Sequence, residues 1–226
     1  AAVSNFNVLR NVGAIQVPEG CTRLPCKDGS FGHWLRKVTL KSDNHVYLYN
    51  GRLKPNQQAQ YAVMDVSVGN KDLQQCADAV MRLRADYLFD QKRFSDIVFI
   101  DNLGKRYAWR GGGDKTSFPS YLNRVFGMCG TASLEKQLNP GSIKNIEPGD
   151  VLIKGGFPGH AMIVVDVAVN KKGERWFVLA QSYMPAQDIH IVKNPNANNS
   201  PWYKAEKLQP ITTPEWTFIP NQLRKS

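Results

Sequence analysis

The sequence predicts an α+β fold in which a long helix packs on an antiparallel sheet. Three apolar runs, at 151–153, 161–168 and 176–180, are rich in Val, Ile, Leu or aromatic residues and are bounded by Gly, Pro or Asn. This is the local pattern of β-strands. The segment 170–174 has turn composition and the length of a hairpin connection. An apolar stripe at helical spacing runs through 72–90 and predicts the helix.

The hairpin brings a histidine and an amide together. If Ala168 lies opposite residue 175, His160 lies opposite about Tyr183. Since side chains alternate between the two faces of a strand, His160 and Gln181 then share a face as diagonal neighbours. A neutral amide can fix the tautomer and orientation of an imidazole. A slip of one residue would separate the two side chains, and His160 would then merely cap a strand.

The helix at 72–90 carries a cysteine near its start. Asp72, with Gln75 three residues later, forms a capping-box pattern. We therefore expect Cys76 in the first helical turn or just past it, on the buried face. A helix N-terminus favours the thiolate form of a cysteine.

The remaining elements are short. A helix is expected at 30–35, and the segment from Asn194 to the end is expected to lie over the surface. Residues 1–55 are interpreted as an N-terminal extension or wrapping segment, and residues 56–226 as the α+β domain. Further strands and short helices are expected at 45–49, 61–68, 94–100, 120–126, 129–134 and 184–191.

Composition narrows the classes of partner. The chain of 226 residues has a formal net charge of +10, which suits an anionic polymer or surface. The basic residues are spread along the chain and the aromatic residues sit inside apolar runs, so no nucleic-acid partner is expected. No apolar run is long enough to cross a membrane, and no cofactor motif is present. The chain begins without Met, which indicates processing or trimming and leaves room for a lipid anchor upstream.

Four cysteines divide into two groups. Cys21 and Cys26 are close in sequence and would form a small disulfide loop in an oxidising compartment. Cys76 and Cys129 are then the free thiols. Both precede or begin a predicted helix, so both are candidate nucleophiles, and the competing interpretation of Cys76 is a small buried core residue.

The order of Cys76, His160 and Gln181 is that of thiol, base and orienting residue in a cysteine hydrolase. The alternative chemistry is a metal site in which His160, Asp188 and His190 supply the ligands. Asp188 and His190 also fit the exposed face of an edge strand.

Two segments resemble a known group of enzymes. Residues 149–153 (Gly-Asp-Val-Leu-Ile) and 159–166 (Gly-His-Ala-Met-Ile-Val-Val-Asp) resemble NlpC-type and CHAP cysteine hydrolases, papain-like enzymes that cut amide bonds in peptidoglycan. Residues 73–78 and 181–185 also resemble an uncharacterised family of bacterial envelope proteins, a domain of unknown function. NlpC-type enzymes usually carry Asp before the nucleophile and Ser-Gly after it, whereas Cys76 follows Gln and precedes Ala.

The resemblance implies a papain-like fold and assigns roles. Cys76 would be the nucleophile, His160 the general base and acid, and Gln181 the orienting residue. The expected function is a cysteine-dependent peptidase or amidase, acting without cofactor on a peptide or peptidoglycan stem. The expected location is the periplasm or cell envelope of a bacterium, outside the cytoplasm. The alternative is a non-catalytic envelope binding protein on the same scaffold.

Overall fold

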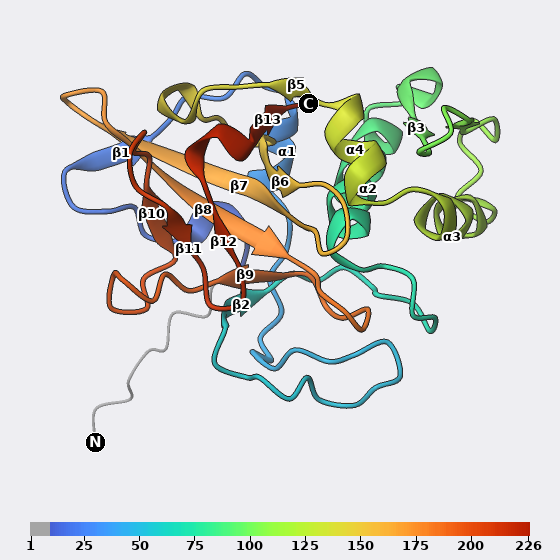
Figure 1. Cartoon of the computed structure of the whole chain (residues 1–226), viewed down its shortest axis with the longest axis horizontal. Helices are drawn as coiled ribbons and strands as arrows, with labels where there is room; N and C mark the ends of the chain where they lie inside the picture. The colour runs from blue at the N-terminus through green and yellow to red at the C-terminus, as the bar shows by residue number, and fades with distance from the viewer. Residues whose placement is uncertain (1–9) are drawn as a thin grey trace.

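A nine-stranded antiparallel sheet forms the centre of the protein (Figure 1). The computed structural model describes residues 10–226. The expectations of N-terminal processing and of an upstream lipid anchor concern the start of the chain, which lies outside the described residues. The order of seven strands is β2-β9-β8-β7-β6-β13-β5, with β1 added to β7 and β10 added to β8.

The strands of the main sheet are β1 (Cys21–Arg23), β2 (Gln60–Val63), β5 (Asn139–Pro140), β6 (Val151–Lys154), β7 (His160–Asn170), β8 (Arg175–Gln181), β9 (His190–Val192), β10 (Trp202–Lys204) and β13 (Leu223–Lys225). Two-stranded sheets are formed by β3 (Val98–Ile100) with β4 (Arg106–Ala108), and by β11 (Ile211–Thr212) with β12 (Thr217–Phe218). The α-helices are α1 (Phe31–Arg36), α2 (Cys76–Asp90), α3 (Phe118–Met128) and α4 (Thr131–Gln137). Single 3₁₀ turns are η1 (Val12–Ala14), η2 (Phe94–Asp96), η3 (Ile143–Asn145) and η4 (Pro220–Gln222). Within residues 10–226, no helix has the length and apolar character needed to span a membrane.

The expected papain-like α+β fold is wrong. The structure is a sheet-rich, antiparallel β fold with few and mostly short helices, and the nine-stranded sheet overturns the expectation. Much of the difference comes from the C-terminal segment, which was expected to lie over the surface. It supplies β10 and β13 to the main sheet and forms the β11–β12 hairpin. Its Asn and Pro residues concealed short apolar pieces such as Trp202–Tyr203, which pair with β8.

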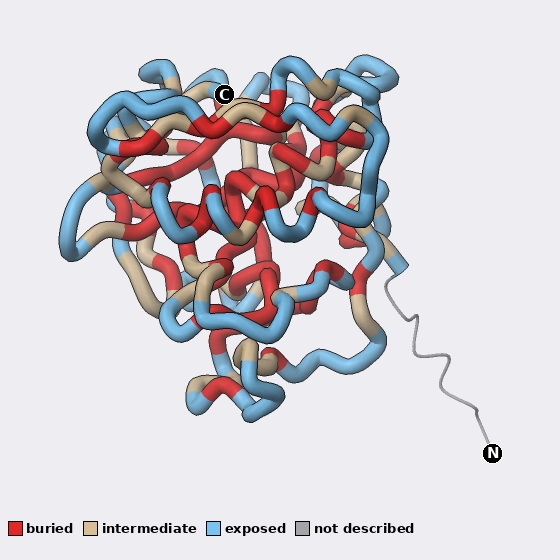
Figure 2. The backbone as a smooth tube through the Cα atoms, turned by 90° about the vertical axis from the view of Figure 1, so that its right-hand side faces the viewer, coloured by how far each residue is buried: buried red, intermediate tan, exposed pale blue. Residues whose placement is uncertain are grey.

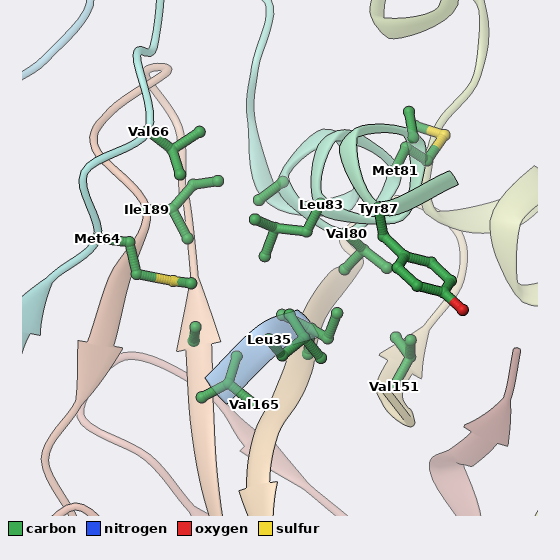
Figure 3. Packing of buried hydrophobic residues seen from close by; sticks show 14 of the residues in the cluster. Leu35, Met64, Val66, Val80, Met81, Leu83, Tyr87, Val151, Val165 and Ile189 are labelled. Carbon is green, nitrogen blue, oxygen red and sulfur yellow. The ribbon is translucent and has the colours of Figure 1, made fainter. Parts of the chain in front are cut away.

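Strand β7 is buried on both of its faces. On one side α2 covers it, and Figure 3 shows Val80 and Leu83 of the helix gathered over Val165 of β7. On the other side Met162 packs in a second cluster with Phe218 of β12, the hairpin drawn in red in front of the sheet in Figure 1. Burial of each large apolar side chain stabilises the fold by ~1.5–3 kcal/mol. Two-sided burial explains why the sequence of β7 is an unbroken apolar run.

Burial follows this arrangement of a sheet covered on both faces. Figure 2 shows the buried backbone concentrated in the middle of the molecule and the exposed backbone in the outer loops. The predicted strands at 151–153, 161–168 and 176–180 and the helix at 30–35 are confirmed. The expected strand at 45–49 is wrong, because this segment makes only isolated bridges.

A β-bulge lies in the middle of β7. Near the hairpin Ala168 pairs with Trp176, whereas further along Ile163 pairs with Ala180, and the register shifts between Val164 and Asp166. A bulge inserts one residue into one strand of a pair and exchanges the faces of all residues beyond it. The expected pairing of Ala168 with residue 175 was therefore one residue off, and the bulge offsets that difference before the strand reaches His160.

A buried carboxylate holds the bulge. Asp166, with its side chain fully buried, accepts hydrogen bonds from Arg23 Nε at 2.9 Å and Arg36 Nε at 2.7 Å. It also accepts the backbone N–H of Val167 at 2.9 Å. Arg36 belongs to α1 and Arg23 to β1. The carboxylate thus links the irregular point of β7 to both N-terminal elements.

We predict that Asp166→Asn lowers the free energy of unfolding by ~3–5 kcal/mol, because it leaves two partly buried guanidinium groups without their common partner. Denaturant titration monitored by circular dichroism measures the loss. The matched control is Asp96→Asn, which removes an exposed pair with Arg93 and should cost less than ~1 kcal/mol. Equal losses in the two variants would contradict a special role for Asp166.

Candidate functional site

Cys76 is the first residue of α2. The helix was expected from residue 72, but Gln75 is its N-cap and the backbone N–H of Gln75 donates to Asp78 Oδ2 at 3.0 Å. The capping role expected of Asp72 is therefore wrong. The thiol consequently lies at the positive end of the dipole of a 15-residue helix.

Two hydrogen bonds fix the start of α2 to the segment that follows β8. Ser182 Oγ donates to the carbonyl oxygen of Gln74 at 2.9 Å. The backbone N–H of Ala186 donates to Asp72 Oδ1 at 2.7 Å. Because β8 ends at Gln181, these contacts hold the beginning of α2 beside the end of that strand.

The thiol of Cys76 lies against the first residues of β7. Burial raises its pKa, while hydrogen bonding from the backbone N–H groups of Ala77 and Ala161 lowers it, and the nearby Asp78 raises it. Ala161 directly follows His160. The structure therefore brings the thiol to the residue next to the predicted base.

His160 and Gln181 are in direct contact. His160 Nε2 and Gln181 Oε1 are 2.7 Å apart, and both side chains are buried. The ring of Tyr183 packs on the imidazole with a centroid separation of 4.7 Å, and that of Trp216 with one of 5.4 Å. Burial lowers the pKa of His160 to about 4, although the bond to Gln181 opposes the shift. His160 is thus a neutral imidazole at neutral pH.

The contacts of Gln181 determine which atom of His160 carries the proton. Gln181 Nε2 lies 3.1 Å from Glu215 Oε1, and a carboxylate only accepts hydrogen bonds. It also lies 3.2 Å from His190 Nε2, whose ring donates through Nδ1 to the carbonyl oxygen of Asp188 at 2.8 Å. Both neighbours require Gln181 Nε2 as donor, so its Oε1 faces His160. His160 therefore carries its proton on Nε2 and presents an unprotonated Nδ1.

Sequence reasoning missed two members of this network, Lys54 and Glu215. Lys54 is only 5% exposed and forms an ion pair with Glu215. Its ammonium group also lies 5.8 Å from the centroid of the Tyr183 ring. No local motif marks either residue, since Lys54 comes from an irregular N-terminal segment and Glu215 from the turn between β11 and β12.

Cys129, the alternative nucleophile, has a different environment. It is the C-cap of α3 and not the first residue of a helix. Burial, together with the neighbouring carboxylates Asp101 and Asp78, raises its pKa to about 11. Cys129 therefore lacks the position at a helix N-terminus that Cys76 has, so the geometry favours Cys76.

The groups expected in the metal alternative are engaged elsewhere. Asp188 accepts from Lys41 Nζ at 3.2 Å and from the backbone N–H of Tyr47 at 2.9 Å. His190 is oriented by its contacts with Gln181 and the backbone. Across residues 10–226, no group of three or more His, Cys, Asp or Glu side chains is placed to hold a metal ion.

The four cysteines are all unbonded. The disulfide considered between Cys21 and Cys26 is therefore absent from this structure, and Cys26 Sγ instead lies 3.7 Å from the carbonyl oxygen of Leu24.

Comparison with known proteins identifies a family. The family described as Domain of unknown function (4846) matches the chain over residues 12–112 and 110–225. No curated protein and no solved structure matches the chain. The resemblance to NlpC-type and CHAP enzymes therefore has no support beyond the two short segments that suggested it.

The buried histidines predict a pH dependence of stability. Burial lowers the pKa of His160 to about 4 and that of His190 to about 3, both below the ordinary value of 6.5. Because the unfolded chain binds these protons more readily, both contributions to stability are complete above pH 6.5 and decline as the pH falls toward 4. We expect a loss on the order of 1–3 kcal/mol for each histidine between pH 7 and pH 4.

Urea titrations at pH 7, 5.5 and 4 test this expectation by comparing the wild-type protein with His190→Gln. The variant should have a flatter dependence of the free energy of unfolding on pH. His45→Gln is the control, since the side chain of His45 is 59% exposed. A wild-type slope in His190→Gln would contradict the prediction.

Proposed function

The chain belongs to the family described as Domain of unknown function (4846), and we propose that it is a cysteine-dependent amide hydrolase. One observation carries the proposal. The thiol of Cys76, at the start of α2, lies near the backbone of Ala161, the residue after His160, and the imidazole of His160 is held by Gln181 with its proton on Nε2.

The resting site holds a neutral thiol and a neutral imidazole. Burial raises the pKa of Cys76 and lowers that of His160, so both shifts disfavour a thiolate–imidazolium pair. His160 therefore acts as a general base at the moment of attack. The proton of the thiol passes to His160 Nδ1 while the sulfur forms a bond with the substrate carbonyl carbon.

The remaining steps follow from the same groups. The tetrahedral intermediate collapses, the carbon–nitrogen bond breaks, and His160 returns the proton to the leaving amine. The resulting thioester on Cys76 is hydrolysed by water, which His160 deprotonates, and the thiol is regenerated. Gln181 supports the transient imidazolium by accepting from its Nε2–H throughout. The backbone N–H of Cys76, in the first turn of α2, is the proposed donor to the oxyanion.

The proposed substrate is a peptide or the peptide stem of peptidoglycan. The net charge of +10 supports attraction to an anionic envelope polymer and, with it, a location outside the cytoplasm. Two exposed apolar side chains flank the strand ends that carry the site: Phe157, which precedes β7 and is 97% exposed, and Met184, which follows β8 and is 51% exposed. They offer contact area to an apolar group of the substrate.

The second candidate function is non-catalytic binding of an envelope polymer. Burial favours it, since Cys76 is 9% exposed and His160 only 1% exposed. A hydrolase would have to move part of the cover formed by Tyr183 and Trp216 to admit a substrate. The two functions differ in whether bound polymer is cut.

We predict that incubation with purified peptidoglycan sacculi releases new primary amines, and that Cys76→Ala abolishes the release. Amine derivatisation and mass spectrometry of the soluble products measure it. Cys129→Ser is the matched control and should release amines at nearly the wild-type rate, because the buried thiol of Cys129 is not among the catalytic groups. If sacculi sediment the protein without any amine release, the binding function replaces the hydrolase.

We also predict the acid limb of the pH–rate profile. Protonated His160 cannot accept the thiol proton, so kcat/KM should decline as the pH falls through about 4, the lowered pKa of His160. His160→Gln should lower the rate by a factor of at least ~100 and remove that limb. A wild-type profile with its acid limb near pH 6.5 would show that the imidazole is not held in the buried environment described here.

A further inference from the structure

One carboxylate controls the amide that holds His160. Gln181 can present either its oxygen or its nitrogen to the imidazole, and the two arrangements select opposite tautomers. Glu215 Oε1 lies 3.1 Å from Gln181 Nε2 and accepts from it. This contact excludes the flipped amide, in which the oxygens of Gln181 and Glu215 would face each other.

We propose that Glu215 is a positioning residue, which through Gln181 keeps the proton of His160 on Nε2 and leaves Nδ1 unprotonated. The proposal rests on the proposed hydrolase function for its effect on rate. The assignment of the tautomer itself depends only on the contacts of Gln181.

The position of Glu215 is set by its turn. The turn between β11 and β12 is closed by the backbone N–H of Thr213, which donates to the carbonyl oxygen of Trp216 at 2.9 Å. In the same turn, the backbone N–H of Trp216 donates to Thr213 Oγ1 at 3.2 Å. The hairpin is anchored to the core through Phe218, which is completely buried. The carboxylate is therefore held by a closed turn. Trp216, the next residue in the same turn, packs on His160.

Lys54 keeps Glu215 in place and compensates its charge. The ammonium group is 5% exposed and the Glu215 side chain 18% exposed, so neither charge is well solvated alone. An isolated buried charge is strongly destabilising, whereas a close pair largely compensates its own desolvation. Burial lowers the pKa of Lys54, and the pair with Glu215 opposes that shift. An ion pair of residues 54 and 215 thus joins distant parts of the chain beside the amide of Gln181.

His190 gives a weaker second constraint on the same amide. Its Nε2 lies 3.2 Å from Gln181 Nε2, and its own tautomer is fixed by the backbone carbonyl of Asp188. A neutral imidazole nitrogen is an acceptor of one bond, while the carboxylate of Glu215 forms the charge-assisted and stronger one. Removal of Glu215 should therefore loosen Gln181 without leaving it completely free.

A matched pair of double variants isolates the acceptor at position 215. Lys54→Met combined with Glu215→Gln removes both charges and keeps an oxygen that can accept from Gln181. Lys54→Met combined with Glu215→Leu removes both charges and the acceptor at similar volume. Neither double variant leaves a buried charge without a partner. Thermal melts establish that both are folded.

The first readout is the tautomer of His160, obtained from long-range ¹H–¹⁵N correlation spectra of the imidazole at pH 7 without substrate. The wild-type protein should show the proton on Nε2, and the Gln variant should retain more of this tautomer than the Leu variant, since its amide can accept from Gln181 but can also donate. The Leu variant should show a mixture of the two tautomers. Because the measurement also works in a Cys76→Ala background, it stands even if the protein cuts no substrate.

The second readout is kcat with peptidoglycan sacculi. The Leu variant should be at least ~10-fold slower than the Gln variant. In the other tautomer His160 Nδ1 carries the proton and cannot act as the base, although the residue is still present. An unchanged His160 tautomer in the Leu variant would overturn the positioning role of Glu215, whether or not amines are released. If the wild-type protein released no amines, the hydrolase function would be contradicted, but the assignment of the His160 tautomer would stand.

Discussion

The bulge in β7, held by the buried carboxylate of Asp166, is the constraint on which the remaining geometry depends. Without the extra residue, the pairing near the turn of the hairpin would continue unchanged and His160 and Gln181 would fall on opposite faces. Asp166 is bound by Arg23 and Arg36, so elements from the first part of the chain stabilise an irregularity in the centre of the sheet. The local cost of a broken ladder is offset by three hydrogen bonds to one carboxylate. The geometry of the candidate site at one end of the strand is therefore linked to an ion cluster in its middle.

The sheet also determines the chemistry available to the site. Since β7 is covered by α2 on one face and by the β11–β12 hairpin on the other, any imidazole on it is desolvated. Desolvation favours neutral forms of both Cys76 and His160, which is opposite to the preformed ion pair that a helix N-terminus would otherwise promote. Under the proposed hydrolase function, the thiol proton would therefore be transferred during attack. This makes the orientation of the imidazole, and not its average charge, the property that the structure must control.

The sequence predicted the long apolar strands and the helix of Cys76, because periodicity and turn residues are local signals. It also predicted the contact of His160 with Gln181, but for an incomplete reason: an error of one residue in the hairpin was offset by a bulge that periodicity does not reveal. It failed on the fold class, since the short strands of the C-terminal segment are stabilised by pairing with distant strands rather than by local propensity. Glu215 and Lys54 were unpredictable for the same reason. Each lies in an irregular segment, and only the tertiary fold brings them to Gln181.

The stability of the fold alone does not explain why Lys54 and Glu215 form a buried ion pair. Their effect on the Gln181 amide does. Apolar residues of similar size at these positions would avoid the desolvation of two charges, and such replacements are often neutral or stabilising elsewhere. An apolar pair would leave the Gln181 amide with only His190 as acceptor, however, and its preference for one arrangement would be weaker. A carboxylate admits one arrangement, because it accepts and never donates. The charge of Glu215 thus strengthens the preference of the Gln181 amide for one arrangement, and Lys54 compensates that charge in the interior.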